Sequence, residues 1–326
     1  MNRARAAAEE LETVQSESAR VLENANIRVE VLPALGGKLI SLYSKRTSTE
    51  WLLPPLRPHA EAKNTAGFEE WDGGGFDECL PTVAATGTAP DHGEVWRHAW
   101  REETAEGAVL LRTSALGGAL DFERRAHLDG TSLVLDYTVE NRSQRPQSLI
   151  YCPHPLLRVE QGDRILLPAE VRDVLVEGSA GDRLGRRGER IEWPGPKVGE
   201  DLSMVGPPDG LQADKVFAGP VTEGWCALLR PSLDEGIELS FSSDVLPYLG
   251  LWICRAAWPD SGAKKQYTVA FEPTGSPHDS LADAEREGTA WRLAPGERRD
   301  WKLRFRIGTQ SQLEKNAQRG RADDRG

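Results

Sequence analysis

Apolar and polar residues alternate over short stretches that are separated by frequent turns, and this pattern predicts strands. Residues 133–139, Leu-Val-Leu-Asp-Tyr-Thr-Val, combine partial alternation with a high content of β-branched and aromatic side chains. The pair Gly36-Gly37 provides a natural turn before another such stretch. We predict strands over residues 28–32, 38–43, 109–113, 132–139, 147–152, 164–167, 225–229, 236–241, 266–271 and 300–307.

Helical periodicity is scarce. One interior segment, Asp279 to Glu287, predicts a short helix that ends at Gly288. The 32 glycines and 21 prolines are spread along the chain, as many turns require. Many strands with few short helices indicate an all-β fold, and a large antiparallel β-sandwich fits better than alternating strands and helices.

The chain shows no internal repeat and no interdomain linker, so we expect one β-sandwich domain over residues 23–308. Residues 1–22 are rich in Ala, Glu and Arg and predict an N-terminal arm that is helical or mobile, and the polar residues 309–326 predict a disordered tail. Residues 54–92 and 170–215 are rich in turn formers. Irregular loops of that length are usually functional.

Composition narrows the function. The 326 residues are 39% hydrophobic and carry a net charge of −11, so a large core can form and nucleic-acid binding is disfavoured. No run of 18 apolar residues predicts a membrane span, and the N-terminus lacks the apolar segment of a secretion signal. The four cysteines form no CxxC pair, so we expect no metal site and a reducing, cytoplasmic location.

Three residues stand in settings that suit acid–base chemistry. His92 follows Asp91 in a turn-rich segment, and His154 lies between two prolines, which fix its backbone. Glu272 comes at the end of a predicted strand, where partial burial would raise its pKa toward the range of a general base. Taken singly, each residue is more simply explained as structural.

A resemblance to a known family joins these residues. Motifs occur in order along residues 24–308, and together they resemble the aldose 1-epimerase (galactose mutarotase-like) family. They are Asn24-Ala-Asn-Ile-Arg-Val-Glu-Val-Leu-Pro-Ala-Leu-Gly-Gly-Lys-Leu-Ile-Ser-Leu42, Gly75-Phe-Asp-Glu-Cys-Leu-Pro81, Asp91-His-Gly-Glu94, Cys152-Pro-His-Pro155, Asp214-Lys-Val-Phe217, Gly250-Leu-Trp-Ile253 and Phe271-Glu-Pro-Thr-Gly275.

The resemblance implies a supersandwich, a large antiparallel β-sandwich with a sugar cleft on one sheet, and interconversion of the α and β anomers of a hexose-type sugar without cofactor or metal. It assigns Glu272 as the base, His154 as the acid and His92 as a supporting group, and it matches Asp214 to an aspartate that binds sugar hydroxyls. The implied partner is a small sugar, and the protein is expected to be a monomer or homodimer without nucleic-acid or membrane partners.

Further substrate-binding candidates are less specific. The Asn-Arg pair that characterised galactose mutarotases carry before the first histidine is missing, and Arg97 and Lys38 are possible substitutes. The aromatic residues that could stack on a sugar ring are Trp71, Phe76, Trp96, Trp252 and Trp258, although core packing explains each of them better. Trp71 and Phe76, which lie beside three glycines in a predicted cleft loop, are the stronger candidates. The remaining candidates are Asp77 and Glu78, which could bind hydroxyls or cap a turn.

Other functions are compatible with the same sequence. The same fold could serve a noncatalytic carbohydrate-binding or regulatory protein. A hexose-6-phosphate 1-epimerase is a second alternative, although Arg97 belongs to no evident arginine cluster. A sugar lyase or hydrolase ranks lowest, since hydrolysis usually needs two carboxylates and only Glu272 is a clear one.

Overall fold

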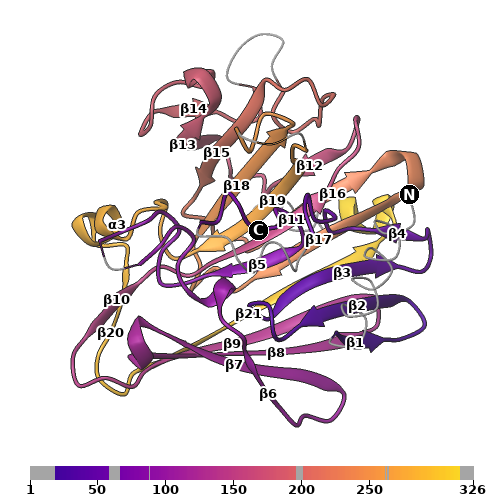
Figure 1. The fold of residues 1–326 in the computed structure, drawn as a ribbon. Helices are drawn as coiled ribbons and strands as arrows, with labels where there is room; N and C mark the ends of the chain where they lie inside the picture. Colours follow the sequence, from indigo (N-terminus) through magenta and orange to yellow (C-terminus); the bar gives the residue numbers. More distant parts are fainter. Residues whose placement is uncertain are drawn as a thin grey trace, which may run out of the picture.

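Two large antiparallel sheets pack face to face in the computed structural model, which describes residues 19–58, 67–87, 89–195, 201–260, 262 and 264–315 (Figure 1). This confirms the all-β sandwich. The larger sheet has eleven strands. Its order is β1 (Arg20–Glu23), β2 (Ile27–Leu32), β3 (Lys38–Ser44), β5 (Phe76–Cys79), β11 (Cys152–Arg158), β19 (Tyr267–Thr274), β18 (Tyr248–Arg255), β15 (Gln212–Ala218), β13 (Asp173–Ser179) and β14 (Arg190–Glu192), with β4 (Thr49–Glu50) paired to β3.

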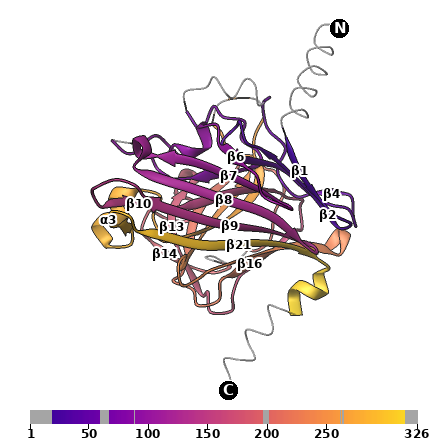
Figure 2. The same ribbon diagram turned by 90° about the horizontal axis from the view of Figure 1, so that it is seen from below.

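The smaller sheet has eight strands, several of which lie side by side across the front of Figure 2. Its order is β12 (Arg164–Leu166), β16 (Trp225–Arg230), β17 (Glu235–Phe241), β21 (Arg298–Gly308), β9 (Ser132–Asn141), β8 (Leu120–Asp129), β7 (Ala108–Ala115) and β6 (Arg101–Glu103). A separate pair joins β10 (Gln147–Leu149) to β20 (Trp291–Leu293).

The alternation of apolar and polar residues explains how β9 packs against the core. Leu133, Leu135 and Tyr137 are buried in the main hydrophobic cluster, whereas Asp136 is partly exposed on the other face. Leu303 of β21 stands opposite Leu135 and is also buried. The inward residues of the two sheets therefore form the layer that holds the sandwich together.

The larger sheet separates a core face from an outer face. On β18, Leu249, Leu251 and Ile253 belong to the main core cluster, so Gly250 and Trp252 must face outward. On the neighbouring β19, Val269 and Phe271 point into the core, and the residues between and after them point outward. The face that a side chain of this sheet occupies therefore determines whether it packs in the core or is available for chemistry.

The predicted helix is confirmed as α3 (Leu281–Glu287). The Ser280 side chain accepts a hydrogen bond from the Asp283 amide, which caps the first turn, and Gly288 ends the helix with a φ of 72°. No helix among the residues described here is long and apolar enough to cross a membrane.

Several expected boundaries were wrong. The segment 54–92 contains β5, and the segment 170–215 contains β13, β14 and the start of β15, so neither is a continuous irregular loop. Strand β1 begins at Arg20, within the predicted N-terminal arm, whose residues 1–18 lie outside the described residues. Residues 310–315 are helical and bury Leu313, so the predicted tail starts with regular structure, and residues 316–326 are not described.

Candidate active site

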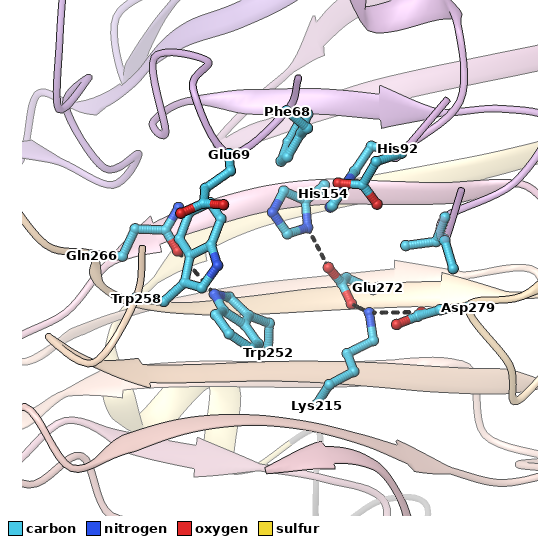
Figure 3. Close-up of a pocket in the computed structure, with 13 residues that line it drawn as sticks. Phe68, Glu69, His92, His154, Lys215, Trp252, Trp258, Gln266, Glu272 and Asp279 are labelled. Carbon is cyan, nitrogen blue, oxygen red and sulfur yellow. Dashed lines mark hydrogen bonds and ion pairs between the residues drawn. The ribbon is translucent and has the colours of Figure 1, made fainter. Parts of the chain in front are cut away.

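A cavity of about 300 Å³ opens on the outer face of the larger sheet. Its floor is formed by side chains from four adjacent strands: His154 on β11, Glu272 on β19, Trp252 on β18 and Lys215 on β15 (Figure 3). Its walls come from connecting segments, which contribute Phe68, Glu69, Val83, Ala84, Asp91, His92, Trp258, Gln266 and Asp279. The volume lies at the small end of the range for small-molecule sites.

Glu272 links two cationic or titratable groups at the centre of the cavity. Its Oε1 accepts a hydrogen bond from Nδ1 of His154, and its Oε2 accepts one from Nζ of Lys215. The same Nζ lies 3.4 Å from Oδ1 of Asp279. The result is a continuous line of charged and proton-carrying groups along the cavity floor (Figure 3).

The environment of Glu272 differs from the one expected. Burial alone would raise its pKa, but the charge of Lys215 and then His154 outweigh burial and lower the pKa to about 2. The residue also lies within β19, which continues to Thr274, rather than at the end of the strand. Glu272 is therefore a buried and permanently ionised carboxylate at neutral pH.

His92 is positioned by its neighbours on three sides. Its Nδ1 lies 2.9 Å from Oδ2 of Asp91, and its ring stacks on Phe68 at 3.6 Å between ring centres. Its ring centre is 5.3 Å from that of His154, in an edge-on arrangement. The backbone of His92 has a φ of 59°, which is uncommon for a residue other than glycine and is typical of functional sites.

Trp252 on the floor and Trp258 in the wall form the aromatic side of the cavity. Trp252 and Trp258 meet edge to face at 6.2 Å between ring centres. The indole N–H of Trp252 donates to Oε1 of Gln266 at 3.0 Å, which fixes the ring against a polar group that also lines the cavity. Such a mixed apolar and polar wall suits a sugar, which has apolar C–H faces and polar edges.

Asp214 does not line the cavity, so its predicted role in binding sugar hydroxyls is not supported by its position. It shares a face of β15 with the core residue Val216, and its carboxylate accepts hydrogen bonds from Ser179 and Arg183. Its neighbour Lys215 occupies the outward position instead, because successive residues of a strand point to opposite faces. On this strand the residue that faces the cavity is therefore the one that follows the predicted residue.

The same alternation separates the candidates on β5. Phe76 is a core residue and packs against Phe305 of the smaller sheet. Glu78 also points between the sheets, where it is fully buried and bonded to Arg124, 2.9 Å from its guanidinium. Neither residue lines the cavity, so neither is placed to bind a substrate there.

Asp77 points to the outer face but does not line the cavity. It stands opposite His154 in the pairing of β5 with β11, and its Oδ2 accepts a hydrogen bond from Lys38 at 2.5 Å. Burial, and then the nearby Asp72, raise the pKa of Asp77 to about 6 against the opposing charge of Lys38.

Two other candidates lie outside the cavity. Trp71 is buried and packs edge to face on Trp96, 4.9 Å between ring centres. Arg97 belongs to the short 3₁₀ turn η1 (Val95–Arg97), is exposed and lies over the ring of Trp96. Among the predicted site residues, the cavity therefore brings together Glu272, His154, His92, Trp252 and Trp258, and it excludes the rest.

Sequence reasoning missed Lys215 on the cavity floor and most of the residues that form the walls. Lys215 had a detectable signal, because it follows a motif aspartate on a strand whose next core residue is Val216. Phe68, Glu69 and Gln266 carry no recognisable pattern, and Asp279 was read only as the start of a helix. These residues reach the cavity through loop paths that a local pattern does not encode.

Comparison with known proteins supports the architecture. No family model matches the sequence, and no curated protein matches it either. Solved structures do resemble it: a candidate aldose 1-epimerase of Escherichia coli K12 is 16% identical with a TM-score of 0.68, covering 89% of this chain and 99% of that one. A galactose mutarotase related enzyme of Lactobacillus acidophilus is 15% identical with a TM-score of 0.65, covering 89% and 97%.

A third similar structure is a galactose mutarotase-like protein of Clostridium acetobutylicum, 15% identical with a TM-score of 0.62 over 89% of this chain and 94% of that one. Within the described part of the chain, no group of three or more histidine, cysteine or acidic side chains could hold a metal ion. At these identities the likeness concerns architecture, and this chain has the galactose mutarotase-like β-sandwich fold.

Proposed function

We propose that the protein is an aldose 1-epimerase that interconverts the α and β anomers of an unphosphorylated sugar. The observation that carries the proposal is the His154–Glu272 pair on the floor of a cavity with an aromatic wall. A carboxylate and an imidazole that are hydrogen-bonded to each other supply one proton acceptor and one proton donor side by side. That is the minimum that ring opening of a hemiacetal requires.

The proton inventory of the reaction balances with these two groups. Glu272 accepts the proton of the C1 hydroxyl, while protonated His154 donates from Nε2 to the ring oxygen as the bond between C1 and that oxygen breaks. The open sugar carries an aldehyde at C1 and a new hydroxyl at the former ring oxygen. After rotation about the C1–C2 bond, the hydroxyl attacks the other face of the aldehyde and both protons return.

His154 is oriented for this role. Its Nδ1 is engaged by Glu272, so the opposite side of the ring faces across the cavity toward Trp252 and Trp258 (Figure 3). His92, held by Asp91 and stacked on Phe68, would hydrogen-bond the reacting end of the sugar. The tryptophans would pack on the apolar face of the ring, as aromatic side chains do in sugar sites.

The charges around the cavity favour an unphosphorylated substrate. Its described lining contains four carboxylates and a single lysine, and no arginine. Arg97, the arginine that follows His92 most closely in the sequence, is exposed outside the cavity. A phosphate would therefore meet like charges without the bidentate partners that usually hold it. This is the reason to prefer a neutral sugar over a hexose 6-phosphate.

The location that we propose is the cytoplasm. All four cysteines are unpaired and buried. Thiols kept in this state are typical of reducing compartments. The small sugar is the only partner that the proposal requires.

The proposal is tested by following the approach to anomeric equilibrium with NMR after a pure anomer is dissolved. A panel of unsubstituted aldohexoses and the corresponding 6-phosphates would be compared. We expect acceleration of the former, and a loss of about 10²–10⁴-fold in Glu272→Gln and in His154→Gln. Glu140→Gln, which alters a carboxylate paired with Arg142 on the other sheet, is the matched control.

Two outcomes would contradict this assignment. Saturable sugar binding without acceleration would identify a carbohydrate-binding protein on the same fold. Acceleration that survives both substitutions would show that the chemistry lies elsewhere in the chain.

A further inference from the structure

Lys215 reaches Glu272 across an intervening strand. Strand β18 lies between β15, which carries Lys215, and β19, which carries Glu272. Lys215 stands opposite Trp252 of β18, and Glu272 stands opposite Gly250, two residues further along. The lysine side chain therefore runs diagonally over β18, passes the ring of Phe217 and ends on Oε2 of Glu272.

Gly250 provides the space for this contact. A Cβ at this position would stand 3.1 Å from both Oε2 of Glu272 and the ring of Phe217. The backbone of Gly250 is not in the left-handed region, so its conformation does not require glycine. A glycine inside a central strand weakens the strand, and it often marks a close approach of other groups. Here the approaching group is the carboxylate that Lys215 binds.

The surroundings of the lysine hold it in this position. Its side chain is one-tenth exposed and lies between Glu272 and Asp279. The backbone carbonyl of Asp279 in turn accepts hydrogen bonds from the amides of Val83 and Ala84, in the loop whose Val83 carbonyl accepts the His92 amide. Lys215 therefore connects the proposed base to the segment that positions His92.

We propose that Lys215 is a positioning residue that holds Glu272 ionised and aligned from the side opposite His154. This rests on the proposed function, in which Glu272 is the proton acceptor. With Oε2 fixed by the lysine, Oε1 remains toward His154, and the carboxylate cannot rotate away when a sugar enters.

The charge balance around Glu272 supports this division of roles. The titratable and charged groups around it are His154 and Cys152 on β11, Cys79 on β5 and Lys215 on β15, and the lysine is paired in turn with Asp279 before α3. Burial raises the pKa of both thiols well above the usual value, so they stay neutral. Lys215 is therefore the one permanent cation among these groups, and its removal leaves Glu272 with His154 alone.

The experiment is a titration of the Glu272 carboxyl carbon by NMR in protein labelled with ¹³C at the glutamate side chain, assigned by its loss in Glu272→Gln. In the wild-type protein we expect the signal to stay at its ionised position throughout the folded pH range. In Lys215→Met the midpoint should rise by about one pH unit or more. In Lys215→Arg, which keeps the charge, the midpoint should stay close to that of the wild-type protein.

The matched control is Lys302→Met. Lys302 forms an exposed ion pair with Asp136, 3.1 Å from Nζ to Oδ1, on the smaller sheet. Its substitution should leave the Glu272 signal unchanged. The acid limb of kcat/KM for anomer exchange should move upward in Lys215→Met together with the NMR midpoint, a change that a purely structural defect would not produce.

The outcomes separate this proposal from the proposed function. If Lys215→Met loses activity while both the Glu272 midpoint and the acid limb stay in place, the positioning role is wrong. If the wild-type protein accelerates no sugar but the midpoint shifts as expected, the epimerase assignment is wrong and the control of Glu272 by Lys215 stands. Gly250→Ala gives a third check, because it keeps the lysine but crowds Oε2, so kcat should fall without the midpoint rise expected of Lys215→Met.

Discussion

Two buried glutamates on opposite faces of the larger sheet show how similar ion clusters serve different ends. Glu78 points into the sandwich, where Arg124, Tyr137 and Tyr151 donate to its two oxygens. Glu272 points outward, where His154 and Lys215 do the same. Both carboxylates are fully buried, but only the second borders a cavity.

The partners decide the electrostatic outcome. Burial raises the pKa of Glu78 even though Arg124 opposes it, whereas the two partners of Glu272 lower its pKa to about 2. The partners of Glu78 are an arginine and two tyrosines, and burial raises the pKa of both tyrosines well above the usual value, so none of the three exchanges protons near neutral pH. A buried carboxylate is therefore a functional candidate when it has a titratable partner and an open side, and burial alone does not make it one.

The largest effect that would sharpen this comparison is on catalysis. In Glu272→Gln the amide can no longer accept the C1 proton, so anomer exchange should slow by about 10²–10⁴-fold. The overall fold should persist, because the amide oxygen still accepts a hydrogen bond. Circular dichroism and the anomer exchange rate, measured on the same sample, would check this. A variant that is unfolded as well as inactive would show that Glu272, like Glu78, is needed for the fold.

The second effect is on stability. Arg124→Met removes the cation beside Glu78 between the two sheets, and it should lower the free energy of unfolding by about 3–5 kcal/mol. Urea denaturation would measure the loss. The anomer exchange rate per folded molecule should stay near that of the wild-type protein, because Arg124 does not line the cavity. A selective loss of activity with unchanged stability would reverse the roles assigned to the two clusters.

A third test uses pH, and two carboxylates of the outer face should respond with opposite signs. Asp77 binds its proton more tightly when folded, so its contribution to stability falls as pH rises from its ordinary value of 3.8 to about 6. Glu272 binds its proton more weakly when folded, so its contribution is complete above its ordinary value of 4.5 and is lost as pH falls to about 2.

These signs are read from differences between the wild-type protein and single variants. The excess stability of the wild-type protein over Asp77→Asn should decrease with rising pH in the upper window, and its excess over Glu272→Gln should increase with rising pH in the lower one. Unfolding by urea at a series of pH values measures both. If the free energies of unfolding of the wild-type protein and a variant change in parallel across the corresponding pH window, the pKa shift of that carboxyl is ruled out.

The smallest effect belongs to the outer face of the smaller sheet. There Arg142 pairs with Asp121 and Glu140, each at 2.8 Å, and its side chain is 52% exposed. Exposed pairs contribute little, so Arg142→Ala should change the free energy of unfolding by less than about 1 kcal/mol. A loss comparable to that in Arg124→Met would show that exposure does not separate the two kinds of ion pair.

The sequence predicted strands such as β9 and β19 but did not predict β11, β15 and β18. Alternation is visible in β9, where Asp136 separates Leu135 from Tyr137. It is hidden in β11, β15 and β18, because their outer residues are buried beneath the loops that form the cavity. These three strands resemble any other apolar stretch, and each of them contributes a side chain to the cavity floor.

The candidate site could be predicted only in part for a related reason. His154 and Glu272 are 118 residues apart, and Lys215 and Glu272 are 57 apart, so their contacts depend on strand order and register. The resemblance to a family supplied the first pair. It also indicated Asp214, and only the register of β15 shows that Lys215 is the residue that faces the cavity.

The strict alternation of β15, β18 and β19 also makes this protein suitable for redesign. Positions 215, 217, 250, 252, 270 and 272 face outward, and the positions between them, including 216, 249, 251, 269 and 271, pack in the core. A combinatorial library restricted to outward positions around the pair proposed to transfer protons would therefore vary the proposed substrate site while leaving the hydrophobic layer intact. Selection for new sugars and selection for thermal tolerance would then act on separate sets of residues in the same three strands.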